Sequence, residues 1–175
     1  MGIHYENLDD VTRGFSLEES ALGNHYPSPR LTDEGLANWV PLLEEALRNH
    51  DDDWLAREIR TRGYMRNREQ YIRQDRTQYR YINIPHAAQQ LGEGEFNRYY
   101  LRGLCRRAQS EGITHLIVYR GKEVRNPRPE SEAKIGTQIA VDALLEALRS
   151  NDFVSIEDTL AVPGGPNSGL TARLP

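Results

Sequence analysis

Three arginines spaced four residues apart are the residues of this sequence best suited to bind a charged group. Arg98, Arg102 and Arg106 fall in a stretch with helical periodicity, so they are expected on one face of a helix. Guanidinium groups recognise phosphate and carboxylate oxygens through paired hydrogen bonds. Because like charges at this spacing repel one another, something must neutralise them: acidic residues of the same chain, a partner protein or nucleic acid.

Further basic residues and tyrosines follow in the next predicted strand and the loop after it. We therefore predict an interface or phosphate-binding surface made of Arg98, Arg102, Arg106, Arg120, Lys122, Arg125, Arg128 and Tyr99. The sequence contains no helix-turn-helix, zinc-finger or RNP signature, and its pI is about 5.8. Nucleic acid therefore remains an alternative to a protein partner.

Catalytic chemistry has weaker support in the sequence. Paired carboxylates could act as general acid and base, and the candidates are Glu93, Glu95, Glu123, Glu130 and Glu132, with His86. Glu93 and Glu95 are explained more simply by the dipole of the helix that they begin. Ser131 has the context of a helix cap, and Cys105 that of a core residue. The five histidines show no ligand spacing, so we predict no catalytic residue, metal or cofactor.

Composition favours one soluble domain. The chain has 175 residues, of which 38% are hydrophobic and 27% charged. No apolar run approaches the roughly 20 residues that cross a bilayer, and the first residues do not have the composition of a secretory signal. A single cysteine excludes an internal disulfide. We expect a cytosolic protein, or one in a particle assembled in the cytosol, with no membrane partner.

Charge is segregated along the chain. Residues 1–56 carry a net charge of −9, residues 57–128 one of +9 and residues 129–175 one of −4. Arginine outnumbers lysine by 20 to 2, which either a GC-rich genome or selection for guanidinium recognition would explain. This layout would allow the acidic surface of one subunit to meet the basic surface of the next.

Apolar periodicity, together with the glycines, prolines and capping residues that end the periodic segments, predicts an α+β domain. It would have a small sheet of two to four strands and about four or five helices. Helices are predicted over 17–22 after Ser16, over 33–49, from Asp51–Asp53 to Gly63, from Glu93 or Glu95 to 111, and over 141–149. Because of Pro41, the second of these either starts later, with Asn38 as its cap, or is kinked. Strands are predicted over 78–85 and 114–120. Three regions result: an irregular N-terminal segment (1–30), the domain (31–158) with an exposed arm near 64–77, and a Pro/Gly-rich tail (159–175).

Five motifs resemble a family of uncharacterised bacterial proteins of similar length. The motifs are HYENLD (4–9), HDDDWLA (50–56), EGEFNRYYLRGLC (93–105), YRGKEVRNPRPESEAKIG (119–136) and GPNSGL (165–170). The resemblance spans most of the chain and implies no activity, cofactor or catalytic residue. The sequence departs most from the family around 64–84, as expected of an exposed segment.

These observations favour a non-enzymatic assembly or protein-interaction subunit, of a phage-derived or other oligomeric particle. The basis for this interpretation is the segregated charge, the ladder formed by Arg98, Arg102 and Arg106, and the aromatic arm near 64–77. The alternative is a protein or enzyme that binds nucleic acid or a phosphorylated ligand through the ladder on the 93–111 helix.

Overall fold

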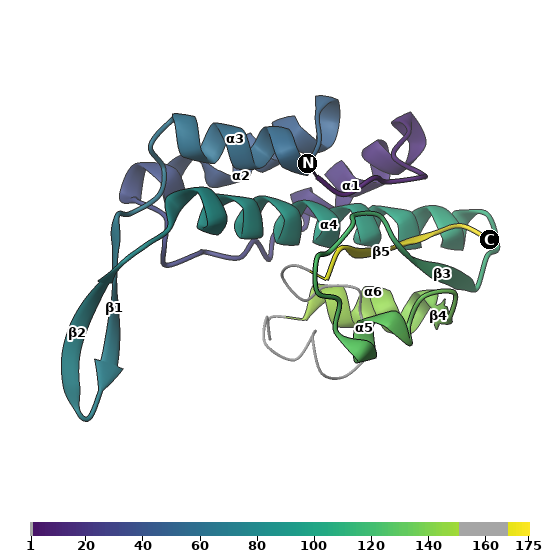
Figure 1. Cartoon of the computed structure of the whole chain (residues 1–175). Coiled ribbons are helices and arrows are strands. Elements are labelled where there is room, and N and C mark those ends of the chain that lie inside the picture. Colours follow the sequence, from purple (N-terminus) through teal and green to yellow (C-terminus); the bar gives the residue numbers. More distant parts are fainter. Residues whose placement is uncertain (1, 151–167) are drawn as a thin grey trace.

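A helix of 27 residues, α4 (Ile84–Ser110), is the axis on which the other elements pack. The computed structural model describes residues 2–150 and 168–175. Helices α1 (Asp10–Ala21), α2 (Asp33–Asn49) and α3 (Asp52–Thr61) lie along one side of α4 (Figure 1). On the other side lie a three-stranded sheet, the short helix α5 (Pro129–Glu132) and helix α6 (Val141–Arg149). The predicted α+β class is confirmed.

Side-chain caps determine where the four long helices begin. In each, an oxygen of the cap accepts a hydrogen bond from a backbone N–H of the first turn, and the caps are Asp9, Thr32, Asp51 and Asn83. The first helix thus starts at Asp10, well before the predicted start after Ser16. Helix α4 starts at Ile84 rather than at Glu93, because Pro85 occupies its first turn, where a missing N–H costs nothing.

Two glycines let α1 and α3 approach α4 closely. A Cβ on Gly103 would lie 2.6 Å from the backbone nitrogen of Ser16 in α1. A Cβ on Gly92 would lie 3.0 Å from the Cβ of Ala56 in α3. The predicted apolar stripe of α4, with Phe96, Tyr100 and Leu104, is fully buried. No helix of the described residues is long and apolar enough to cross a bilayer.

The three-stranded sheet is antiparallel throughout, with β3 (His115–Arg120) in its centre. Strand β4 (Gln138–Ala140) pairs with one edge of β3 and β5 (Leu170–Arg173) with the other. Residues 170–173, assigned by sequence to the C-terminal tail, therefore complete the sheet. The Pro/Gly-rich part of that tail falls mainly in 151–167, outside the described residues.

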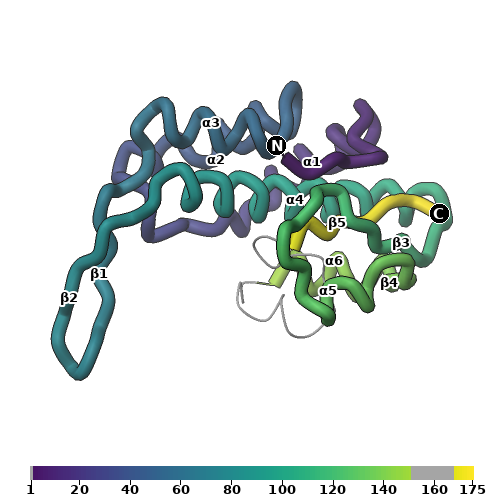
Figure 2. The backbone as a smooth tube through the Cα atoms, in the orientation of Figure 1, coloured from purple at the N-terminus to yellow at the C-terminus, as the bar shows by residue number. Residues whose placement is uncertain are grey.

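A separate two-stranded hairpin projects from the body beside the start of α4 (Figures 1 and 2). Its strands are β1 (Arg68–Arg73) and β2 (Arg76–Tyr81), paired in register from Arg68↔Tyr81 to Arg73↔Arg76. The two turn residues, Gln74 and Asp75, have φ of 50° and 57°, as a type I′ turn requires. The predicted arm and the predicted strand over 78–85 are thus two halves of one element, which we call the hairpin arm (68–81).

Candidate interaction site

The predicted arginine face of α4 is not a surface. Arg98 and Arg102 expose only 6% and 1% of their area, so the expectation that they face outward is wrong. Acidic side chains of the same chain neutralise them, which was one of the three alternatives. Tyr99 is also buried, and its hydroxyl donates to the backbone oxygen of Gly23 at 3.1 Å.

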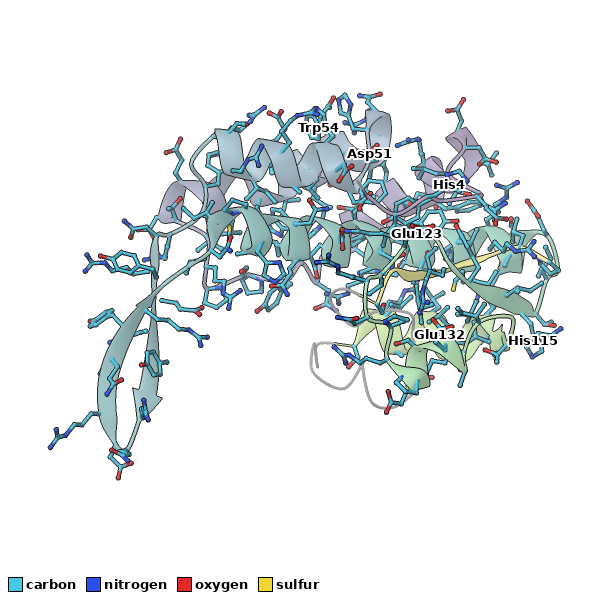
Figure 3. All side chains as sticks on the ribbon, viewed as in Figure 1. His4, Asp51, Trp54, His115, Glu123 and Glu132 are labelled. Carbon is cyan, nitrogen blue, oxygen red and sulfur yellow. The ribbon has the colours of Figure 1, made fainter. Side chains whose placement is uncertain are left out.

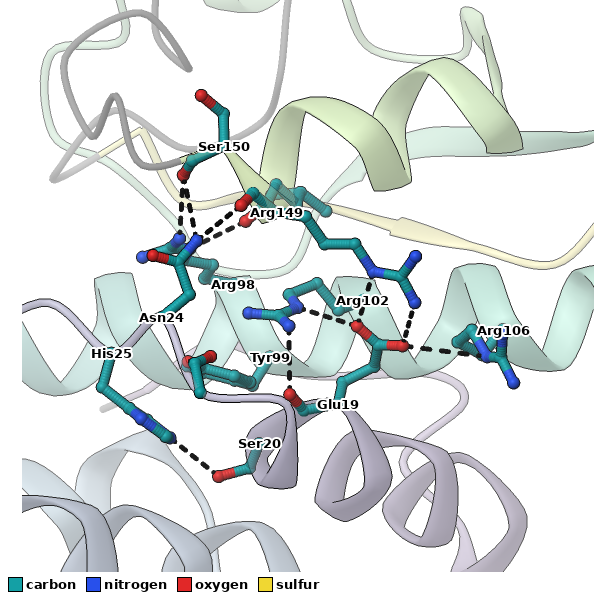
Figure 4. A network of polar contacts seen from close by, with 12 residues as sticks. Glu19, Ser20, Asn24, His25, Arg98, Tyr99, Arg102, Arg106, Arg149 and Ser150 are labelled. Carbon is teal, nitrogen blue, oxygen red and sulfur yellow. Dashed lines mark hydrogen bonds and ion pairs between the residues drawn. The ribbon is translucent and has the colours of Figure 1, made fainter.

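Glu19 of α1 is the centre of this buried network (Figure 4). Arg102 donates from Nε to a Glu19 carboxylate oxygen and from Nη2 to the Glu19 backbone oxygen, both at 3.0 Å. Arg149 of α6 binds the same carboxylate through Nε, at 2.9 Å, and Nη2. Arg106 is half-exposed, and its Nε lies 3.7 Å from Glu19. Three elements are therefore joined through one carboxylate.

The pKa shifts and hydrogen bonds of this network indicate that it joins parts of the fold. Burial alone would raise the pKa of Glu19, but hydrogen bonds from Arg149 and Arg102 hold it below its usual value. Burial raises the pKa of Glu95, although Arg98 lies 3.8 Å away. Arg98 donates to the backbone oxygens of Leu148 at 3.1 Å and Ser150 at 3.3 Å, at the end of α6. It thus binds carbonyl groups that a helix end leaves without partners.

The remaining predicted basic residues are dispersed around β3. Lys122 binds Glu93, and Arg120 binds Glu132. Arg125 and Arg128 are exposed on the loop before α5. Of the eight predicted residues, Arg120 and Arg128 line one small cavity, and the eight do not form a continuous surface.

The carboxylates considered for catalysis do not converge. Glu93 contacts Lys122 and Gln89, whereas Glu95 lies beside Arg98. Glu132 and Glu123 lie well apart in Figure 3, near α5 and beside the loop after β3. His86 is exposed in the first turn of α4. Residues 2–150 and 168–175 contain no group of three or more His, Cys, Asp or Glu that could hold a metal ion.

Exposed arginines and exposed apolar side chains meet instead on the hairpin arm. Since cross-strand partners share a face, the register gives it two distinct faces. The tyrosine face carries Arg68, Gln70, Ile72, Thr77, Tyr79 and Tyr81. The arginine face carries Glu69, Tyr71, Arg73, Arg76, Gln78 and Arg80. Ile72, Tyr79 and Tyr81 expose 78%, 66% and 74% of their area, although such side chains are usually covered in a sheet.

The tip of the arginine face has a local electrostatic cost. Arg73 and Arg76 are direct cross-strand partners, and like charges in such a pair destabilise it. Neither forms an ion pair with any residue that the structure describes. At the base of the arm, by contrast, Glu69 binds both Arg30 and Arg80, at 2.7 and 2.5 Å. The arm is therefore anchored at its base, whereas at its tip, which carries Asp75 as well as Arg73 and Arg76, neither arginine is held by an ion pair with a described residue.

Sequence reasoning missed the residues of this site because β1 does not read as a strand. Its outward positions are occupied by both charged and apolar residues, so no alternation separates a core face from a solvent face. The usable signal was the alternation of tyrosine and arginine in 76–81. A preceding run of equal length, Arg68–Arg73, could have been tested as its hairpin partner.

A complementary surface lies on α1, towards the opposite end of α4. The exposed stripe of α1 and its C-cap consists of Asp10, Val11, Gly14, Glu18, Ala21 and Leu22. Among described residues, no ion pair involves Asp10 or Glu18. We call this stripe the α1 face. It combines exposed apolar side chains with acids that form no ion pair with a described residue, as the arm combines such side chains with arginines that form none.

Comparison with known proteins adds no constraint: neither a family model, nor a curated protein, nor a solved structure matches the chain. What the protein does must therefore be inferred from the arm, the α1 face and their chemistry.

Proposed function

We propose that the protein is a non-enzymatic assembly subunit, in which the hairpin arm of one copy docks on the α1 face of the next. One observation carries the proposal: arginines without an ion pair and exposed apolar side chains share the arm, while carboxylates without an ion pair and exposed apolar side chains share the α1 face, all among described residues. Such complementarity directs association and fixes its register. Tyrosine and arginine are also the residues that most often dominate interface energies.

The dimensions of the two surfaces agree. Each strand of the arm has six residues and so spans roughly 20 Å. Helix α1 has 12 residues and spans roughly 18 Å. The arm could therefore lie along the whole α1 face. An isolated two-stranded hairpin is marginally stable in water, and docking would bury the part of the arm that carries Arg73 and Arg76.

The position of the two surfaces determines the kind of assembly. The arm adjoins the first turn of α4, while α1 crosses α4 at Gly103, in its C-terminal half (Figure 1). Different surfaces at opposite ends of a subunit make a head-to-tail contact. Such contacts close into rings or continue as filaments, as expected for a subunit of an oligomeric particle.

Reciprocal charge reversal tests the proposal. One variant carries Arg73→Glu and Arg76→Glu on the arm, and the other carries Asp10→Arg and Glu18→Arg on α1. Mass photometry and light scattering would measure their association. Each variant alone should be monomeric under conditions where the wild type forms oligomers. An equimolar mixture should form oligomers again, because the acidic arm of the first variant then meets the basic α1 face of the second.

A matched control separates this contact from general charge effects. Arg57→Glu with Arg60→Glu changes the same charge on exposed positions of α3 and should leave association unchanged. A wild type that stays monomeric at micromolar concentration would overturn the proposal. So would a mixture of the two variants that remains monomeric.

Nucleic acid is the competing partner that the same experiment can reveal. A two-stranded ribbon fits the major groove of DNA, and tyrosine and arginine can stack on bases. This alternative now involves the arm, because Arg98 and Arg102 are buried. If the wild type is monomeric and binds DNA or RNA with a steep salt dependence that the arm variant loses, the assembly proposal is replaced by nucleic-acid binding.

A further inference from the structure

A small cavity lies where β3 ends, between the loop that follows it and α5. Its volume is about 100 Å³, and it is lined by Arg120, Val124, Asn126, Pro127, Arg128, Ser131 and Ser168. Among the described residues, the lining includes two arginines, one amide and two hydroxyls, and no carboxylate. Since the lining provides cations and neutral donors, a ligand that fits it would be an anion.

Arg120 has the feature that points most directly to a ligand. Its Nη1 binds Glu132, but its Nε and Nη2 are buried and have no hydrogen-bond acceptor among the described residues. A buried charged donor without an acceptor is costly and rare. Glu132 compensates the charge of Arg120 and leaves that of Arg128 in excess at the cavity.

The two unpaired atoms form the edge of the guanidinium that binds oxyanions. In this same molecule, Nε and Nη2 of Arg30 hold both carboxylate oxygens of Glu69, at 2.7 and 3.2 Å. Nε and Nη2 of Arg149 hold the carboxylate of Glu19 in the same way. The corresponding edge of Arg120, a residue that lines the cavity, is thus expected to bind an oxyanion through the same two atoms.

We propose that this cavity binds a phosphate group, either as inorganic phosphate or as the terminal group of a phosphomonoester. A carboxylate has two oxygens, and the Arg120 fork alone would satisfy both. A phosphate has further oxygens for Arg128, Ser131 and Asn126, each of which can donate. The walls formed by Val124 and Pro127 enclose about one such group. The site is separate from the arm and does not depend on the proposed assembly.

Thermal unfolding and calorimetry with inorganic phosphate would test the site. Titration of the whole chain with potassium phosphate, against potassium chloride at equal ionic strength, should give a saturable rise in Tm and a measurable Kd. Arg128→Gln, an exposed position, should weaken binding by about tenfold or more, the effect expected for one charge-assisted hydrogen bond. Arg120→Gln should abolish binding. Arg125→Gln, an exposed arginine of the same loop that does not line the cavity, should bind as the wild type does.

The choice of ligand distinguishes the outcomes. Tighter binding of phenyl phosphate than of inorganic phosphate would identify a phosphomonoester site, and the reverse would identify a site for the free ion. Equal binding of acetate would overturn the assignment to phosphate. A wild type with no saturable response, or one that Arg128→Gln and Arg120→Gln both retain, would overturn the site itself. If Arg120→Gln fails to fold, the comparison of Arg128→Gln with Arg125→Gln still decides.

Discussion

The arginines of α4 and those of the hairpin arm have the same chemistry and opposite environments. Arg102 is buried and shares Glu19 with Arg149, whereas Arg73 and Arg76 are exposed and face each other across the hairpin. In α4, the cost of like charges at helical spacing is offset by Glu19, which is distant in the sequence, and by Glu95 of the same helix. In the arm, no described residue forms an ion pair with either arginine. An arginine cluster therefore suggests a partner only where the fold brings no carboxylate to it.

The largest change in stability is expected when the carboxylate that Arg102 and Arg149 share is removed. Glu19→Ala should lower the free energy of unfolding by about 3–5 kcal/mol, because it leaves Arg102 buried without its anion. Urea denaturation followed by circular dichroism would measure the loss. Glu18→Ala, on the exposed side of the same turn, should change that free energy by less than about 0.5 kcal/mol. Equal effects of the two would show that the buried network is not stabilising.

A second buried carboxylate, Asp52 of α3, sharpens the comparison, because no arginine binds it. The backbone N–H of Ile3 donates to its Oδ2 at 3.0 Å, while its Oδ1 is buried with no hydrogen-bond partner among described residues. Burial, together with the charges of Asp53 and Asp51, raises the pKa of Asp52 to about 6. Glu19 and Asp52 thus shift in opposite directions, and the arginines account for the difference.

These shifts predict opposite effects of pH on stability. The pKa of Asp52 is higher in the folded chain than in the unfolded one, so the folded state holds the proton more tightly, and stability should fall between about pH 4 and 6 as pH rises. Asp52→Asn should remove this fall and raise the free energy of unfolding at pH 8 by about 1–2 kcal/mol. Glu19, whose pKa is lowered, should make stability rise with pH below about 4.5. A denaturation series across pH would check both, and an unchanged profile in Asp52→Asn would contradict the assignment.

The smallest expected change in stability concerns the arm. Arg76→Glu replaces a pair of like cross-strand charges with an opposite pair, so it should stabilise the folded chain by about 0.2–1 kcal/mol. The same change should weaken association of the subunit by about tenfold, through loss of a charge at the interface. Denaturation and mass photometry of one preparation would give both values. A variant that loses stability would show that Arg73 and Arg76 are compensated within the fold.

Helices and strands whose bounds follow from their own residues could be predicted from the sequence. Helices α2, α3 and α6 and strand β3 were predicted close to their observed bounds, since their apolar periodicity matches the face that they bury. The role of Arg102 could not be predicted, because Glu19 lies 83 residues away. Strand β5 was missed because its few residues follow a run of glycine and proline and are buried only by pairing with β3 and packing on α4, both distant in the sequence. The hairpin arm was found only as an exposed segment, since neither of its faces is a core face.

The central position of β3 has a consequence for the order in which the chain folds. Helices α1 to α4 can pack on one another from residues 10–110 alone, as the chain leaves the ribosome. Both neighbours of β3 come later, and β5 last. Backbone oxygens of Leu170 and Ala172 accept hydrogen bonds from Asn97 at 3.0 Å and Tyr100 at 3.2 Å. The side of α4 that faces the sheet is thus fully covered only after some 60 further residues have been synthesised. We therefore expect a helical intermediate to form before the sheet during synthesis.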